Sequence, residues 1–382
     1  MTKLKVVDLF AGAGGLSLGF KKAGYDICSH IEIDERCCET IEANASSMEQ
    51  IFNKDITDHK SYLKDLKTSI GGNLDGIIGG PPCQAYSIAG RNKEENKMDK
   101  DPRNFLFESF DFLLRRLKPK FFIFENVPGM LSATPFGIDI NSQIYESFKK
   151  SGYHVRSNFK ECVFDMSDFG IPQKRKRVII FGVRKSEYKN YEQVVESFYS
   201  SMEKKKKKKK KTVSDAIGDL PKLFPQQVSN RISHSSNKEF SEHEPRFHNE
   251  RDIKIFRLLA KDIETGNNKF TSTEALKKVY EKFTNKKSSV HKYFVLRWDE
   301  PSNIIPAHIY KDGLRHIHPD SQQARSITVR EAARLMTFPD SYKLKGNRGD
   351  KYKMLGNAVP PEFSKIIAKV IVKILNISKE NF

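Results

Sequence analysis

A cysteine stands directly after two glycines and two prolines in the segment Gly79-Gly80-Pro81-Pro82-Cys83-Gln84-Ala85-Tyr86-Ser87. This composition predicts a tight, rigid loop that follows the apolar run Leu74–Ile78. A thiolate held on such a loop can act as a nucleophile, so Cys83 is a candidate for covalent catalysis, with Pro82 beside it. A buried structural cysteine is the default for a lone cysteine, and the Pro-Pro-Cys-Gln context argues against it.

A carboxylate stands at the end of one further apolar run, and two arginines stand just before another. Glu125 ends the run that starts at Phe121, and it could donate a proton or a hydrogen bond to a bound ring. Arg175 and Arg177 alternate before the run Val178–Val183, which could direct one guanidinium into a site and the other at a phosphate. A solvated strand-end glutamate and a surface charge cluster are the simpler interpretations of these residues.

A glycine-rich turn opens the chain in Asp8-Leu9-Phe10-Ala11-Gly12-Ala13-Gly14-Gly15-Leu16. Glycines between a strand and a helix let the backbone approach a ligand closely, and Glu32 after the next apolar run could accept from ribose hydroxyls. The pattern indicates a nucleoside-containing cofactor. NAD, FAD and S-adenosylmethionine sites all begin this way, and a purely structural turn is the alternative.

Apolar runs alternating with amphipathic stretches must position these residues. The expected strands are Leu4–Leu9, Ile27–Ile33, Leu74–Ile78, Phe121–Glu125, His154–Val163 and Val178–Val183. The expected helices are Leu16–Ala23, Arg36–Asn44, Asn104–Leu117, Asn141–Ser151, Arg330–Met336 and a last one with Ile366, Ile367, Val370, Ile371 and Ile374 on one face. This order predicts an α/β fold with a mostly parallel sheet and helices on both faces, with the ligand edge at the carboxyl ends of the strands.

Composition narrows the class of protein. The 382 residues include 67 lysines and arginines against 48 aspartates and glutamates, a formal net charge of +19, which is typical of a protein that meets nucleic acid or an anionic membrane surface. We find no signal peptide and no apolar run long enough for a membrane span. Five cysteines without a C-x-x-C pair argue against a disulfide framework or a zinc site, and predict a reducing, cytoplasmic setting.

The alternation of apolar runs and amphipathic stretches stops after residue 184. We expect four segments: a first catalytic and cofactor-binding part at 1–185, a lysine-rich linker at 186–221, a small irregular domain at 222–325, and a return to the first domain at 326–382. The small domain holds seven of the ten histidines and the only tryptophan, Trp298, but no convincing set of metal ligands. The run of eight lysines from Lys204 to Lys211 is either a solvated linker or a non-specific phosphate-binding arm.

Taken in this order, and with two later segments, these motifs closely resemble the DNA (cytosine-5) methyltransferase family of bacterial restriction–modification type. The later segments are Arg330-Glu331-Ala332-Ala333-Arg334-Leu335 and Leu355-Gly356-Asn357-Ala358-Val359-Pro360-Pro361. The resemblance covers about residues 4–184 and 326–375. It implies a Rossmann-like, S-adenosylmethionine-dependent fold in which the small domain recognises the DNA target.

The resemblance also implies roles for individual residues. Cys83 after Pro82 matches the nucleophile, Glu125 the acid, Arg177 the active-site arginine and Arg175 its neighbour near the flipped nucleotide. The implied contacts to S-adenosylmethionine are Phe10, Gly12, Gly14, Leu16, Glu32, Ile33, Asp55, Ile56, Leu106 and Asn357. No metal is implied. The chain departs from the family at Asn303-Ile304-Ile305-Pro306, where relatives often carry threonines.

The implied function is site-specific methylation of carbon 5 of a flipped cytosine in double-stranded DNA through a covalent Cys83 adduct. Partners would be DNA and, acting on the same site, a cognate restriction endonuclease; a monomer is favoured and no membrane is involved. Aromatic residues among basic ones, as in Lys292-Tyr293-Phe294, Arg297-Trp298 and His308-Ile309-Tyr310, suit DNA contacts, although most should form the core of the small domain. The alternatives are a tRNA cytosine-5 methyltransferase, a DNA-binding regulator that has lost catalysis, and a nicotinamide oxidoreductase, which would explain only the glycine turn.

Overall fold

Short runs of Val, Ile and Phe form one large sheet in the computed structural model, which describes residues 3–82, 105–134, 137, 139–229, 231–237 and 239–380. The strands are β1 (Lys5–Leu9), β2 (Asp26–Glu32), β3 (Gln50–Asn53), β4 (Gly76–Gly79), β5 (Phe121–Asn126), β6 (Tyr153–His154), β7 (Val163–Asp165) and β8 (Lys176–Arg184). Their order is β3-β2-β1-β4-β5-β8-β6, and β7 also pairs with β8. The pairs from β3 to β5 are parallel, whereas β6, β7 and β5 pair with β8 antiparallel.

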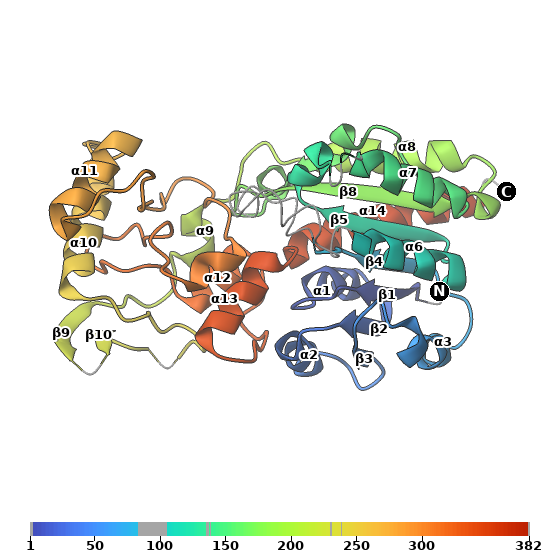
Figure 1. Cartoon of the computed structure of the whole chain (residues 1–382), viewed down its shortest axis with the longest axis horizontal. Helices are drawn as coiled ribbons and strands as arrows, with labels where there is room; N and C mark the ends of the chain where they lie inside the picture. The colour runs from blue at the N-terminus through green and yellow to red at the C-terminus, as the bar shows by residue number, and fades with distance from the viewer. Residues whose placement is uncertain are drawn as a thin grey trace.

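Helices cover both faces of this sheet, as the unbroken apolar character of its central strands predicts (Figure 1). They are α1 (Gly15–Lys22), α2 (Glu35–Glu42), α3 (Leu63–Ile70), α6 (Leu106–Leu117), α7 (Ile140–Lys150), α8 (Tyr191–Glu203) and α14 (Pro361–Glu380). Phe122 of β5 contacts Phe110 of α6 and Phe148 of α7. Phe121 faces the opposite way and contacts Phe181, which stacks on Phe198 of α8. Alternate residues of one strand therefore anchor helices on the two faces.

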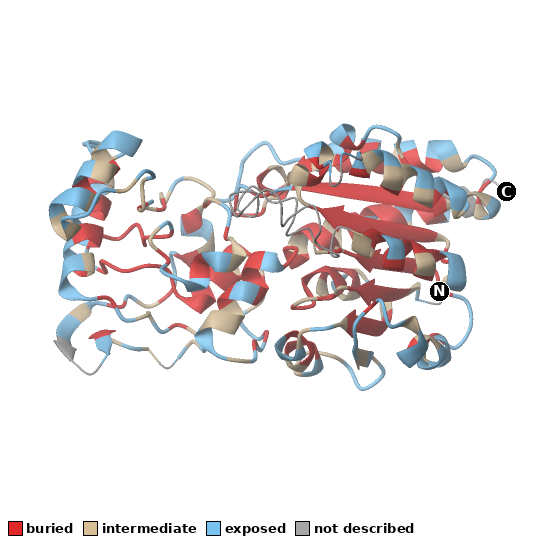
Figure 2. Ribbon diagram, in the orientation of Figure 1, coloured by how far each residue is buried: buried red, intermediate tan, exposed pale blue. Residues whose placement is uncertain are grey.

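A smaller lobe lies beside the sheet (Figure 1). It contains α9 (Val213–Ile217), β9 (Pro225–Ser229), β10 (Ile232–His234), α10 (Glu250–Glu264), α11 (Thr273–Thr284), α12 (Val329–Leu335) and α13 (Arg348–Asn357). Buried residues form a core within the sheet lobe, a second around α9, α12 and α13, and a third between α10 and α11 (Figure 2). None of the helices in the described ranges has the length and apolarity that crossing a bilayer needs.

The strand and helix predictions up to residue 151 are confirmed to within about two residues, except that Asn104 lies outside the described residues. The single strand expected at His154–Val163 is wrong. β6 ends at His154, and Asn158 accepts a hydrogen bond from the Lys160 backbone and starts a 3-10 turn before β7 begins. The hydrogen bond to the Asn158 side chain stabilises a turn here, in place of the backbone hydrogen bonds that would continue the strand.

Segment 186–221 is more ordered than the expected linker. Its helix α8 buries Val194, Val195, Phe198 and Met202 in the core of the sheet lobe, and packs against α14 and β8. Helices α12 and α13, expected with the sheet, share a core with α9 of the smaller lobe. The division of the chain into four domain segments stays a prediction. The packing shows that α8 belongs with the sheet and that α12 belongs with the smaller lobe.

Candidate active site

Chain direction brings the predicted residues to one edge of the sheet. The parallel strands β1, β2, β4 and β5 end there, at Leu9, Glu32, Gly79 and Asn126. Strand β8 runs the opposite way, so it begins at the same edge, where its Val178 pairs with Asn126. The carboxyl edge of an open α/β sheet is where such folds bind ligands.

Glu125 and Arg177 form an ion pair at this edge. Arg177 Nε lies 2.8 Å from Glu125 Oε1, and the two side chains are only 9% and 11% exposed. Arg177 also donates from Nη1 to the Lys176 carbonyl at 2.8 Å. Burial lowers the pKa of Arg177, and the charge of Glu125 opposes that shift. The pair holds a carboxyl group and a guanidinium side by side with little water, which suits recognition of a polar ring.

The loop that carries the candidate nucleophile starts against Glu125. A Cβ atom on Gly80 would lie 2.6 Å from Glu125 Oε2, so only glycine fits there without displacing the carboxylate. Pro81 is buried and Pro82 is half-buried. Cys83 itself lies outside the described residues. The structure therefore brings Glu125, Arg177 and the start of the Cys83 loop together, and it leaves the position of the thiol a prediction.

Arg175 has a different environment from Arg177. Its side chain is 1% exposed and donates to three backbone carbonyls: Ile305 at 3.3 Å, Gly356 at 3.0 Å and Ala358 at 2.9 Å. Burial lowers its pKa, and the neighbouring charge of Arg177 adds to that effect. Instead of pointing outward to a phosphate, this arginine joins the start of β8 to the end of α13 and to the segment before the 3-10 turn at Ala307–Tyr310.

The glycine turn is organised by Glu32. Its carboxylate accepts from the Gly12 backbone at 2.7 Å and from the backbones of Ile33 and Asp34 at 2.9 and 2.8 Å. Gly12 and Gly14 have φ of 54° and 69°, in the left-handed region that favours glycine, and the space beside Gly12 is open. Burial raises the pKa of Glu32, and the three backbone donors oppose the shift. An open glycine turn beside a half-buried carboxylate fits a nucleoside with free hydroxyls.

The other predicted cofactor residues are spread around this turn. Phe10 adopts a positive φ of 57°, Leu16 is buried at the start of α1, and Ile33 is 66% exposed after β2. Ile56 is buried, and Asp55 accepts from the Thr57 backbone and hydroxyl. Leu106 is half-buried and begins α6, and Asn357 is exposed at the end of α13. An apolar side chain left exposed beside a polar cradle, as Ile33 is, offers a face to a flat ring.

The segment after Asn357 packs directly on the glycine turn. A Cβ atom on Gly15 would lie 2.3 Å from the Val359 carbonyl, and the Ser364 hydroxyl donates to the Leu16 carbonyl. Tyr342 donates to the Ala13 carbonyl at 2.7 Å, a contact that sequence reasoning missed. Tyr342 follows Phe338-Pro339-Asp340, whose turn residues were the available signal.

Sequence reasoning also missed Asp8 as a buried charge. Both of its carboxylate oxygens lie without a hydrogen-bond partner among the described residues, and His30 Nδ1 is 4.0 Å from Oδ2. Burial raises the pKa of Asp8 to about 6, against the opposing effect of His30. The sequence motif indicated a role for the glycines that follow Asp8 and none for Asp8 itself.

The arginine-rich motif at 330–335 is structural in this molecule. Glu331 accepts two hydrogen bonds of 2.7 Å from Arg325, and both side chains are fully buried. Arg330 donates to the carbonyl and hydroxyl of Ser241. Arg334 pairs with Asp340 and with Asp219 at 2.6 Å each. These bonds attach α12 to the loops of the smaller lobe.

The aromatic residues of the smaller lobe divide between core and surface. Tyr293 is buried, and the half-buried Trp298 packs against the core around α12 and lies edge-on to His318. Phe294 and Tyr310 remain 39% and 46% exposed. A pocket of about 440 Å³ nearby is lined in part by Arg246, Arg251, Lys286 and Lys311, so this lobe presents exposed rings next to cations.

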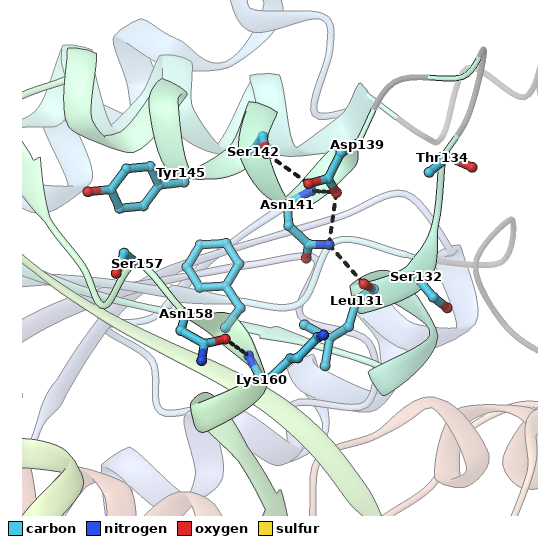
Figure 3. Close-up of a pocket in the computed structure, with 11 residues that line it drawn as sticks. Leu131, Ser132, Thr134, Asp139, Asn141, Ser142, Tyr145, Ser157, Asn158 and Lys160 are labelled. Carbon is cyan, nitrogen blue, oxygen red and sulfur yellow. Dashed lines mark hydrogen bonds between the residues drawn. The ribbon is translucent and has the colours of Figure 1, made fainter.

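A further pocket of about 440 Å³ lies at the start of α7 (Figure 3). Its polar groups are used locally: Asp139 accepts from the Asn141 backbone and the Ser142 hydroxyl, and Asn141 donates to the Leu131 carbonyl. These bonds cap α7 and join it to the turn after β5. We assign this pocket no part in the site.

An open α/β sheet with a glycine turn and a carboxylate at its carboxyl edge is the arrangement of nucleoside-binding folds. The sequence matches the family described as C-5 cytosine-specific DNA methylase over residues 4–373, and the chain belongs to that family. Members of this family in general use S-adenosylmethionine.

Curated relatives align over almost the whole chain. The type II methyltransferase M.Bpa9945I of Bacillus paralicheniformis is 33% identical over 97% of this chain and 99% of its own length. M.DdeI of Desulfomicrobium norvegicum, also a type II methyltransferase, is 32% identical over 96% and 88%. A prophage-encoded candidate DNA modification methyltransferase from E. coli has a solved structure with a TM-score of 0.69 and 25% identity, covering 98% of this chain and all of its own.

Proposed function

We propose that this DNA (cytosine-5) methyltransferase acts at a specific site in duplex DNA, with Cys83 as nucleophile and with Glu125 and Arg177 as the groups that hold the target ring. The observation that carries this proposal is the 2.8 Å Glu125–Arg177 ion pair beside Gly80. Gly80 directly follows the last residue of β4 and stands three residues before Cys83. A paired carboxyl and guanidinium beside a thiol-bearing loop match what cytosine chemistry requires.

The chemistry explains why these residue types are needed. Carbon 5 of cytosine is a poor nucleophile inside a stacked duplex, so the base must first be flipped out, which costs a few kcal/mol. The Cys83 thiolate then forms a bond to carbon 6, and ring electrons move to carbon 5. Glu125, in its protonated form, donates to ring nitrogen 3, and Arg177 binds the exocyclic oxygen. After methylation, the carbon 5 proton leaves to a base, for which water suffices, and the sulfur–carbon 6 bond breaks.

The cofactor-binding residues fit S-adenosylmethionine, which when bound supplies the methyl group. Glu32 would hold the ribose hydroxyls, and Gly12 and Gly14 would let the backbone approach the ligand, since the space beside Gly12 is open. Ile33, Asp55, Ile56, Phe10, Leu16, Leu106 and Asn357 would surround the remainder. Because the segment after Asn357 packs on the glycine turn, the end of α13 would close the same site.

The curated relatives suggest the biological role. They are named as type II methyltransferases, so we infer that this enzyme protects host DNA in the cytoplasm against a restriction endonuclease with the same target site. The smaller lobe, built largely from the expected recognition segment 222–325, would read the target. Exposed Phe294 and Tyr310 are the residues we expect to approach the DNA.

The test is transfer of a labelled methyl group to unmethylated duplex DNA and, separately, to bulk tRNA, followed by bisulfite sequencing of the DNA. We expect label on DNA with wild type and none with Cys83→Ala, while both proteins bind S-adenosylmethionine equally. Cys162→Ala is the matched control, because Cys162 is buried in the sheet lobe on the β7 side. Label on tRNA alone would overturn the proposed substrate, and full transfer by Cys83→Ala would overturn the nucleophile.

A further inference from the structure

The lysine run, Lys204 to Lys211, connects the two lobes and is held in place at both ends (Figure 1). At its start it continues from the end of α8, where the Lys204 backbone donates to Ser200. At its end Thr212 caps α9, whose Val213 and Ser214 backbones donate to the carbonyls of Glu300 and Trp298 in the smaller lobe.

A turn of the sheet lobe holds the middle of the run. The Lys207 backbone donates to the Asp168 carbonyl at 2.6 Å. Lys210 Nζ lies 2.9 Å from Asp168 Oδ1 and 3.1 Å from the Ser167 hydroxyl. A solvated linker needs no such contacts, so the run has a defined place in the fold.

Local structure explains only some of the eight charges. Lys204 to Lys206 follow the carboxyl end of α8, where cations are favourable, and Lys206 pairs with Glu203. Lys210 pairs with Asp168. Lys207, Lys208, Lys209 and Lys211 are exposed and have no ion pair within 4 Å among the described residues, although the charges of Lys209 and Lys211 help to lower the pKa of the nearby Asp215. Four neighbouring cations on a fixed segment repel one another, and a polyanion would relieve that repulsion.

The run is close to the active-site edge. Phe164 of β7 pairs with Arg177 of β8, and four residues later the chain reaches Asp168, which holds Lys210. Four residues span at most about 14 Å, so the Asp168 backbone lies within roughly 20 Å of the Arg177 backbone once the spacing of about 5 Å between paired strands is added. Each DNA strand carries one phosphate per about 3.4 Å of helix axis, so a duplex with its target base beside Arg177 has several phosphates within roughly 20 Å of that residue.

We infer that Lys207, Lys208, Lys209 and Lys211 form a fixed clamp for the phosphates of the duplex that flank the target cytosine. This inference rests on the proposed function. Phosphate contacts carry no sequence information, so the clamp raises affinity for all DNA alike and leaves the choice of site to the smaller lobe.

The test compares two triple variants. Lys208→Gln, Lys209→Gln and Lys211→Gln together remove three clamp charges. Lys60→Gln, Lys64→Gln and Lys67→Gln together remove three exposed charges on and beside α3, which packs against β2 at the other end of the sheet. The dissociation constants for a cognate and an unrelated duplex are measured between 50 and 300 mM salt, and steady-state methylation is measured with both proteins.

For the clamp variant, we expect the magnitude of the slope of log affinity against log salt to be smaller by about 2 to 3 than for wild type. We also expect its affinity for DNA near 0.15 M salt to be lower by on the order of 10- to 100-fold. The loss should be equal for both duplexes, with kcat at saturating DNA unchanged, and Lys→Arg at the same three positions should restore the slope. The control should match wild type. A slope equal to that of the control, or a loss confined to the cognate duplex, would refute the clamp. A wild-type protein that methylates no DNA would instead refute the proposed function, because the slopes are measured without turnover.

Discussion

Glu125 and Arg177 lie nearly out of water, so each depends on the other for compensation of its charge. Their 2.8 Å contact combines opposite charges with a directed hydrogen bond. Removing one member leaves the other buried and uncompensated, which typically costs about 3–5 kcal/mol. The proposed function gives the catalytic role to the same two residues that stabilise each other, so a variant must be tested for stability and for activity.

We expect Glu125→Gln to lose methyl transfer by 100-fold or more and to unfold at lower denaturant, because Arg177 loses its counter-charge. The double variant Glu125→Gln with Arg177→Met should recover part of the stability and none of the activity. Urea unfolding and single-turnover transfer measure the two effects separately. Single and double variants of equal stability would contradict the coupling.

Asp8 is a buried acid whose ionisation in the folded protein costs free energy. Its pKa of about 6 lies above the ordinary value of 3.8, so its contribution to stability is fully present below about pH 4 and is lost as the pH rises to about 6. Asp8→Asn should therefore be more stable than wild type at pH 7.5, by about 1–3 kcal/mol. The two proteins should converge at pH 4. Urea unfolding across this range measures the difference, and a variant less stable at pH 7.5 would show that ionised Asp8 has a favourable role.

The sequence predicted residue positions better than residue environments. Glu125 and Arg177 could be assigned to one edge, because strand ends and chain direction follow from the apolar runs. The burial of Arg175 could not be predicted, since its three carbonyl partners lie more than 100 residues away along the chain.

At the scale of elements, Arg175 connects β8 to the end of α13 and to the segment after it, which packs on the glycine turn. A lysine ammonium also has three donors, but all of them are on one nitrogen at the end of a flexible stem, whereas Arg175 donates from two nitrogens held in a rigid plane. We expect Arg175→Lys to raise KM for S-adenosylmethionine several-fold with a smaller change in kcat, because Gly356 and Ala358 flank Asn357. Equilibrium dialysis with labelled cofactor measures the binding directly.

Arg115→Lys is the matched control, since the Arg115 side chain is 57% exposed and pairs with Asp111 one helical turn away, so the exchange should change little. A fall in kcat without any change in cofactor affinity would argue that Arg175 acts on the base rather than on α13.

The elements differ in how well the sequence predicted them. Strands β1, β4 and β5 are confirmed because their apolar runs are buried on both sides and need no distant partner to be recognised. Helices α10 and α11 were missed within a segment judged irregular, although Asn249 and Ser272 cap their first turns. Caps of this kind were the available signal.

At the scale of the whole molecule, the Arg325–Glu331 pair joins the loops of the smaller lobe to α12. The neighbouring Arg325 charge holds the pKa of Glu331 far below its usual value against a strong effect of burial. The pair therefore stabilises the fold above the ordinary glutamate pKa of about 4.5, and this contribution is lost as the pH falls below it.

Glu331→Gln should cost about 3–5 kcal/mol at pH 7, and its stability should fall less than that of wild type between pH 6 and pH 4. Thermal unfolding across this range measures both effects. Glu196→Gln is the control, because Glu196 is 53% exposed and should cost less than about 1 kcal/mol. Parallel acid profiles for wild type and Glu331→Gln would contradict the assignment.

At this scale, the sequence could not predict which segments share a hydrophobic core. Residues near 330 and near 215 share one core through contacts that span more than 100 positions, and no local pattern reports such a pairing.

The four cysteines in the described part of the chain are all buried. Burial raises the pKa of Cys28 and Cys162 to about 11 and that of Cys38 to about 12, and it raises the pKa of Cys37 as well. Alkylating reagents react with thiolates, so these four should stay silent at neutral pH. We therefore expect one equivalent of a maleimide to label the folded enzyme at Cys83, and we expect bound DNA to protect that thiol.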